Sequence, residues 1–238
     1  MAIRIEKVEN IADIMAFDVM ATPGVVIDAG VVVAVLWVIT QLNPLTQVFG
    51  TGHLRGTFDL PAYVFHTPSL LLSAEATVVM FNLLGIGLLL STLLRAESRH
   101  GPVIAAVITA ALGCKMLITV FLAKPQGAWA WMTPGVLLGF ILGAIMLAGL
   151  LSLGQAARLA LALLALLLAL AAINLAPDNP YFSLPPQLAS GRSSHFLSFS
   201  NILQALSELW PLIALGYLGA ALWHTRTRSR AQPSALTL

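Results

Sequence analysis

The chain has 238 residues, of which 58% are hydrophobic and only 9% are charged. Soluble proteins carry roughly 25% charged residues, so this composition excludes an ordinary soluble domain and indicates an integral membrane protein. The net charge of +2 comes from basic residues that are thinly spread and mostly flank apolar runs. That pattern is typical of membrane topology, so no nucleic-acid partner is expected. Cys114 is the only cysteine, which excludes an internal disulfide and a zinc site made of thiolates.

Residues 1–20 are predicted to be a cytoplasmic or interfacial amphipathic lead-in. They contain four acidic residues and no apolar run, which argues against a signal peptide. Six apolar runs of about 20 residues follow, each about long enough to cross a bilayer. The sequence therefore predicts an all-α, polytopic membrane protein with six transmembrane helices within residues 21–225. The predicted helices are 24–42, 68–94, 102–122, 134–153, 156–176 and 201–223.

The distribution of Lys and Arg predicts the orientation. If the N-terminus is cytoplasmic, the inside segments hold eight Lys and Arg residues and the outside loops hold three. Positive residues concentrate on the cytoplasmic side, so both termini are expected there. Residues 226–238 then form a basic cytoplasmic tail.

The two predicted outer loops, residues 43–67 and 177–200, are rich in Gly, Pro and aromatic residues. Loops this long are usually functional or disordered, and their aromatic content argues against simple disorder. We expect both to fold back over the outer ends of the helices, with their aromatic rings at headgroup depth. These rings belong to Phe49, Phe58, Tyr63, Phe65, Tyr181, Phe182, Phe196 and Phe199, beside Trp129 and Trp131.

Basic side chains in these loops suggest an anion site. His53, Arg55, Arg192 and His195 offer donors for a lipid headgroup phosphate, although the arginines could instead cap helix ends. The motif "GTGHLRG" is not a phosphate loop, because it lacks the Lys-Ser/Thr pair and neither follows a strand nor opens a helix. No two of the histidines have metal-ligand spacing, so neither a metal nor a cofactor is expected. No catalytic residue is predicted.

Residues 134–153 contain a ladder of glycines four residues apart, Gly135, Gly139 and Gly143. Small residues at this spacing allow two helices to approach closely in a membrane. The ladder predicts an internal packing seam, and a subunit interface is the alternative.

Lys115 lies within a predicted span, where a charge is costly and is normally paired. Glu75 lies seven residues after Pro68, Glu208 lies seven after Asn201, and Lys115 lies seven before Leu122. All three are therefore about 10 Å below the outer boundary. This common depth predicts an ion pair of Lys115 with Glu75, Glu208 or both. Such a cluster could be a packing device that fixes which helices meet, or a polar pocket that receives a headgroup or peptide. The remaining alternative is a lysine that reaches the interface.

Further polar residues join this predicted cluster. Asn82 shares a helix face with Glu75, and Gln204 shares one with Glu208. Pro211 cannot donate a backbone hydrogen bond, so it should free a carbonyl near Ser207 for a buried donor.

The stretches "LWVITQLNPLTQVFGTGHLRG" (36–56) and "AINLAPDNPYFSLPPQLASGRSSHFLSFSNILQALSELWPLIALGYL" (172–218) carry a family resemblance. They resemble the carboxy-terminal half of VanZ-like membrane proteins of proteobacteria. The resemblance implies a multi-pass bacterial inner-membrane protein associated with the cell envelope and glycopeptide resistance, and it implies no catalytic residues. The amino-terminal VanZ module has no counterpart here, because residues 1–20 do not form a membrane span.

Three function classes are compatible with the sequence. The first is a non-catalytic accessory envelope protein whose structured outer face contacts membrane lipids or lipid-linked partners. The second is a small accessory subunit packed against other membrane protein subunits. The third is a transporter or membrane enzyme for a lipophilic substrate, although no internal repeat typical of transporters is visible.

Overall fold

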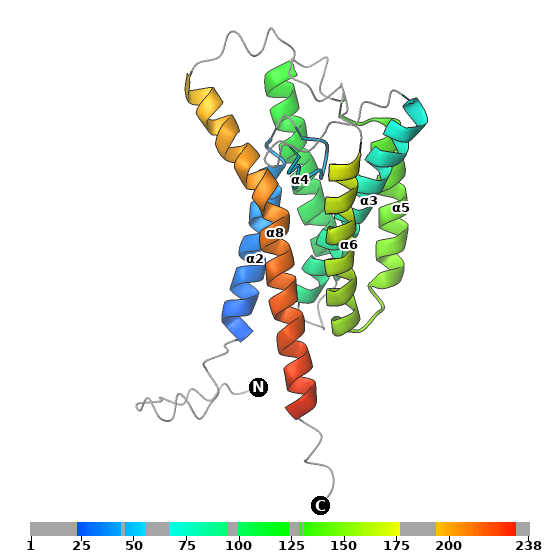
Figure 1. Ribbon diagram of the computed structural model, residues 1–238, viewed down its shortest axis with the longest axis vertical. Coiled ribbons are helices and arrows are strands. Elements are labelled where there is room, and N and C mark those ends of the chain that lie inside the picture. Colours follow the sequence, from blue (N-terminus) through cyan, green and yellow to red (C-terminus); the bar gives the residue numbers. More distant parts are fainter. Residues whose placement is uncertain are drawn as a thin grey trace, which may run out of the picture.

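The computed structural model describes residues 23–43, 46–55, 67–94, 100–123, 129, 131–176 and 194–231. Within these ranges helices are the regular secondary structure and no strand is present, which confirms the all-α part of the predicted fold class. The predicted lead-in, residues 1–20, lies outside the described residues. The helices are α2 (Pro23–Thr40), α3 (Pro68–Leu93), α4 (His100–Ala123), α5 (Pro134–Leu150), α6 (Gln155–Leu175) and α8 (Ser194–Ala231), arranged as a bundle (Figure 1).

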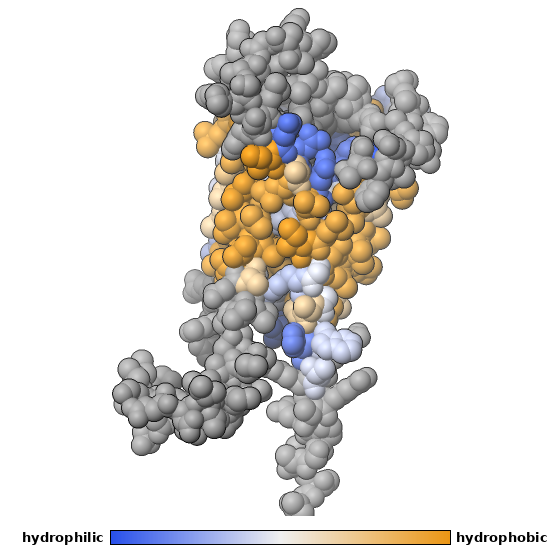
Figure 2. All heavy atoms as spheres, turned by 60° about the vertical axis from the view of Figure 1, so that its left-hand side comes forward, coloured by the Kyte–Doolittle hydropathy of each residue, from blue (hydrophilic) through white to orange (hydrophobic). Residues whose placement is uncertain are grey.

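Four of these helices, α3, α4, α6 and α8, contain segments long and apolar enough to cross a membrane. The helices α2 and α5 are apolar but shorter, with 18 and 17 residues. Apolar residues form a broad band around the middle of the bundle, seen on one face in Figure 2. The protein is therefore built as a membrane protein.

The helix α3 is the centre of the bundle. It packs mainly against α5 on one side and α6 on another, and every residue from Asn82 to Ser91 is buried. Two glycines allow these close contacts: Gly85 lies against Leu166 of α6, and Gly87 lies against Leu147 of α5. A helix that is buried on all sides, as the second half of α3 is, is typical of the core of a helical bundle.

The helix α8 packs against α2 and α6, and α4 makes limited contacts with α2 and α3. Trp210 is fully buried, and its indole Nε1 donates to the backbone oxygen of Val33 over 2.8 Å. This bond ties α8 to α2 across the core. Figure 1 shows α2 and α8 side by side.

Five of the six predicted spans agree with the observed helices to within a few residues. The last one differs, because α8 begins at Ser194, inside the expected loop 177–200, and continues to Ala231, past the expected boundary of the tail at residue 226. Sequence hydropathy identifies only the apolar part of this helix, because its two ends are too polar to be predicted as part of a membrane span.

Candidate functional site

Residues 46–55, which we call the inserted segment, form non-helical backbone enclosed by helices. Val48 and Phe49 have no exposed surface, and Thr51 is 2% exposed. Hydrogen bonds join the segment to four helices, α3, α4, α6 and α8, and to Gln41, the residue that follows α2. Irregular backbone at membrane depth is tolerated only where protein buries it or a cavity is lined by it, so such a segment marks a candidate functional site.

Phe49 lies in the interior rather than at the headgroup depth expected from the sequence. Its ring centroid is 5.0 Å from that of Trp37 and 5.4 Å from that of Phe140. Its φ of 59° places a bulky residue in the left-handed region, which costs roughly 1–2 kcal/mol. The aromatic packing and a 3.0 Å bond from the Phe49 backbone N–H to Oε1 of Gln41 hold this conformation.

The segment is bound to α8 at the carbonyl that Pro211 frees. The backbone N–H of Gly52 donates to the Ser207 oxygen over 2.9 Å, which confirms the prediction made from the position of Pro211. Gly52 has a φ of 86°, and a Cβ atom there would lie 2.5 Å from Cδ1 of Leu170. Only glycine fits both the conformation and the space.

Asn174 of α6 binds the same turn with its whole amide group. Its Oδ1 accepts from the Leu54 backbone N–H over 2.9 Å, and its Nδ2 donates to the oxygens of Gly52 and Leu170, each over 2.8 Å. One side chain therefore gives a second hydrogen bond to each of two backbone groups of the inserted segment, which also bond to one another over 2.9 Å.

Arg55 is 4% exposed and caps the end of α6. Its Nη2 donates to the backbone oxygens of Asn174 and Ala176 over 2.6 and 2.7 Å. The last carbonyls of a helix lack partners and carry partial negative charge, so a guanidinium is well placed there. Arg55 thus takes the capping role that the sequence offered as the alternative to headgroup binding.

Lys115 anchors α4 to the start of the inserted segment. It is 2% exposed, and its Nζ donates to the backbone oxygens of Asn43 and Thr46 over 2.7 and 2.5 Å. The expected ion pair with Glu75 or Glu208 is therefore wrong. Backbone carbonyls solvate the ammonium group in place of a carboxylate.

The polar residues predicted to cluster with Lys115 have separate partners. Glu75 accepts from the Thr133 hydroxyl over 2.5 Å. Asn82 donates over 3.0 Å to Val78, within its own helix. At the exposed surface of α8, Gln204 Nε2 donates to Glu208 Oε1 over 3.0 Å.

The glycine ladder of α5 lies directly against α3. A Cβ atom at Gly139 would be 2.4 Å from the Ala76 backbone oxygen, and one at Gly143 would be 3.0 Å from Cδ2 of Leu83. At Gly135 the added atom would be 2.6 Å from Oε2 of Glu75, so this glycine makes room for the buried carboxylate. The ladder is an internal seam in this chain.

The four outer-loop candidates do not all fall within the described residues. His53 is exposed, and Arg55 is committed to α6 as described above. Arg192 lies outside the described residues. His195 lies in the first turn of α8, but its side chain is outside the described part of the chain.

In the ranges that the structure describes, no group of three or more His, Cys, Asp or Glu residues could hold a metal ion. Comparison with protein-family models, curated proteins and solved structures gives no match to this chain.

Replacing Asn174 by leucine should release the inserted segment from α6. The change removes two hydrogen bonds of the Asn174 amide and leaves the Leu54 N–H and the Gly52 carbonyl only their 2.9 Å bond to one another. A lost hydrogen bond costs about 0.5–1.5 kcal/mol, so we expect the free energy of unfolding in mild detergent to fall by about 1–3 kcal/mol. The matched control is Asn201→Leu, at an exposed position of α8, which should leave the melting temperature nearly unchanged. Equal melting temperatures for the two variants would contradict this role of Asn174.

Proposed function

We propose that the chain is a non-catalytic, VanZ-like accessory protein of the bacterial inner membrane, whose rigid outer face contacts membrane lipids or lipid-linked envelope partners. The observation that carries this proposal is the inserted segment. Its hydrogen bonds connect it with α3, α4, α6 and α8 and with Gln41, the residue that follows α2. Alternating access requires one part of a transporter to rock against another, and contacts with this many helices oppose such movement.

The proposal includes six spans with both termini in the cytoplasm. The two shorter helices support it, because the 17 residues of α5 extend about 26 Å, close to the hydrocarbon thickness of about 30 Å. The excess of Lys and Arg on the proposed inner side gives further support. In this orientation, the inserted segment lies at the outer end of the bundle.

Cysteine labelling tests the orientation. In a Cys114→Ala background, His53→Cys should react with an impermeant maleimide in intact cells, because residue 53 is exposed at the proposed outer end. Ser152→Cys is the matched control, exposed in the turn between α5 and α6 at the proposed inner end, and should react only after permeabilisation. Labelling of Ser152→Cys in intact cells would overturn the six-span arrangement.

A second candidate function is a small subunit of a larger membrane complex. The surface of α4 favours this function. Only 17% of its apolar membrane-crossing segment is buried within the chain, and the side chain of Leu117 is 69% exposed. Such a surface faces either lipid or another protein.

Photo-crosslinking separates the two candidates. A photoreactive amino acid at position 53 should form adducts with lipid or lipid-linked envelope molecules if the accessory role is correct. The same group at position 117, on the exposed face of α4, should then yield lipid adducts alone. A protein adduct of defined mass at position 117 would favour the subunit role, and absence of any adduct at position 53 would overturn the accessory role.

A further inference from the structure

Two hydroxyl groups and one indole N–H beside the inserted segment have no hydrogen-bond partner in the part of the chain that the structure describes. They are Oγ1 of Thr51, Oγ of Ser207 and Nε1 of Trp37. None of the three side chains is more than 2% exposed, so bulk solvent does not reach them. Buried polar groups in proteins are bonded to other protein groups or to ordered water, because an unsatisfied one is unfavourable. These three atoms therefore need a partner that the described chain does not supply.

Ser207 differs from hydroxyl residues in the other helices. Thr40, Ser91 and Thr119 each donate to a backbone oxygen of their own helix, three or four residues earlier. Such a bond is the usual way in which a helical hydroxyl is satisfied. Ser207 makes no bond of this kind, so its hydroxyl remains available to a ligand.

The hydroxyls of Thr51 and Ser207 lie on the two sides of one backbone hydrogen bond. The N–H of Gly52, the residue after Thr51, donates to the Ser207 oxygen over 2.9 Å. This bond keeps the Cα atoms of Thr51 and Ser207 within about 8 Å of one another, and each hydroxyl oxygen extends about 2.4 Å from its own Cα. A water molecule that makes two hydrogen bonds of about 2.8 Å spans roughly 5.6 Å. One water molecule can therefore reach both hydroxyls.

The indole of Trp37 lies beside the same contact. Its ring centroid is 5.0 Å from that of Phe49, two residues before Thr51, and 6.5 Å from that of Trp210, three residues after Ser207. Trp210 donates its own indole N–H to a backbone oxygen of α2, whereas the N–H of Trp37 has no such acceptor. Trp37 thus adds a third buried group to the two hydroxyls.

The chemistry of these groups fits water. An indole N–H only donates, whereas a hydroxyl both donates and accepts. A bridging ligand must therefore accept from Trp37, which a cation cannot do, and exchange hydrogen bonds with Thr51 and Ser207. A buried water molecule typically makes about three hydrogen bonds to otherwise unsatisfied groups. We propose that Thr51, Ser207 and Trp37 bind one buried water molecule where the inserted segment meets α8 and α2. This inference is independent of the accessory function proposed above.

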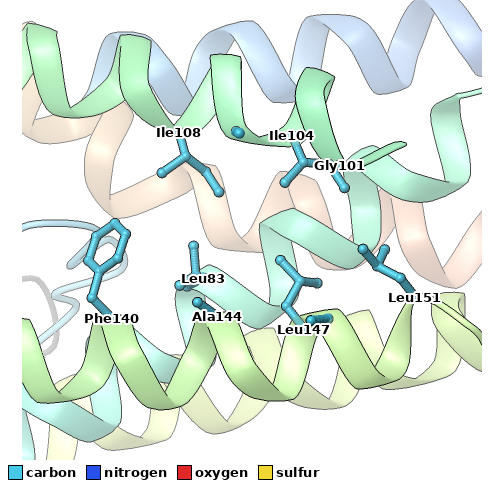
Figure 3. Close-up of a pocket in the computed structure, with 10 residues that line it drawn as sticks. Leu83, Gly101, Ile104, Ile108, Phe140, Ala144, Leu147 and Leu151 are labelled. Carbon is cyan, nitrogen blue, oxygen red and sulfur yellow. The ribbon is translucent and has the colours of Figure 1, made fainter. Parts of the chain in front are cut away.

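The apolar groove between α4 and α5 is not a comparable site. Ile104 and Ile108 of α4 face Phe140 and Leu147 of α5 across it (Figure 3). Its volume is about 190 Å³, but its lining offers almost no polar group to which a water molecule could bond. Polar partners, rather than space alone, distinguish the site at the inserted segment.

X-ray footprinting with mass spectrometry tests for this water. X-rays split water into hydroxyl radicals, which oxidise side chains next to a bound water even where bulk solvent does not reach. In the intact chain in mild detergent, we expect Trp37 to be oxidised although it is fully buried. Its oxidation rate should fall about fivefold in the double variant Thr51→Val, Ser207→Ala, which removes two of the three partners of the water.

The matched control is Ser91→Ala. It removes a buried hydroxyl that is bonded within its own helix, so the oxidation rate of Trp37 should not change. Absence of Trp37 oxidation in the unmodified chain would overturn the proposal. An equal rate in the unmodified chain and the double variant would overturn it as well.

The sign of a change in melting temperature provides a second test. If a water molecule satisfies the hydroxyls, Thr51→Val and Ser207→Ala each remove a bond and should lower the melting temperature by about 2–4 °C. At a dry site each would remove an unsatisfied group and raise it. Because the two hydroxyls share one water, the double variant should lose less than the sum of the two single losses. A higher melting temperature in both single variants, or losses that add fully, would contradict a shared water.

Discussion

Replacing Gly139 by leucine should prevent α5 from packing against α3. Even a single methyl group at this position would lie 2.4 Å from the Ala76 backbone oxygen and 3.0 Å from the Ala76 Cα, and neither atom can rotate away. Overpacking by one methyl group typically costs about 1–3 kcal/mol, so we expect Gly139→Ala to lower the free energy of unfolding by that amount. Gly139→Leu should abolish the folded bundle, measured as loss of the monodisperse peak on size exclusion in mild detergent.

Gly149 provides a control in the same helix. A Cβ atom at Gly149 would meet nothing within 4 Å. Alanine has a higher helix propensity than glycine by up to about 1 kcal/mol, so Gly149→Ala should leave the melting temperature unchanged or raise it. Equal losses of stability at positions 139 and 149 would mean that the close approach to α3 is not what requires the glycine.

These contacts were partly predictable from the sequence, because some residues impose local constraints. A glycine every fourth residue defines one face of a helix, so Gly135, Gly139 and Gly143 mark a packing seam before its partner is known. Pro211 lacks an N–H, which leaves the Ser207 carbonyl without its helical donor wherever the helix lies. In both cases the covalent structure creates a requirement, and the structure shows the group that meets it.

The inserted segment could not be predicted in the same way. Asn174 binds a turn about 120 residues earlier in the chain, and the capping bonds of Arg55 span a similar separation. The hydrophobic periodicity of a sequence gives no information about contacts between such distant residues. Aromatic residues in a loop are equally compatible with a position at the membrane interface and a position in the protein interior. The sequence signal that was present, the Gly-rich stretch ending at Gly52, indicates a tight turn but not its depth.

The predicted partner of Lys115 is wrong for a geometric reason. Counting residues from a helix end gives depth in the membrane, and Glu75, Lys115 and Glu208 do share a depth on that count. Depth is one coordinate, whereas an ion pair also requires the three helices to face one another. The structure instead places Thr133 beside Glu75 and Gln204 beside Glu208, and it turns Lys115 towards the backbone that follows α2.

Replacing Lys115 by methionine should release α4 from the inserted segment. The change leaves the Thr46 carbonyl without this donor, at about 1–3 kcal/mol for an unsatisfied buried group, and leaves the Asn43 carbonyl only the 3.3 Å bond from the Thr46 hydroxyl. Removing a buried ammonium group offsets part of this cost, because a desolvated charge is itself unfavourable. We therefore expect a net loss of about 1–4 kcal/mol in the free energy of unfolding. Cys114→Ala, at the neighbouring, partly buried position, is the control and should change stability little.

Two further measurements separate this anchor from an ion pair. Thr51 is 2% exposed, so Thr51→Cys in the Cys114→Ala background should react slowly with a maleimide, and adding Lys115→Met should raise the rate about tenfold or more. Glu75 has Thr133 as its partner, so the losses from Lys115→Met and Glu75→Gln should add to within about 0.5 kcal/mol. If Glu75→Gln instead restored stability to Lys115→Met, the two side chains would have to be a charge pair, and the assignment of Lys115 to the carbonyls of Asn43 and Thr46 would be wrong.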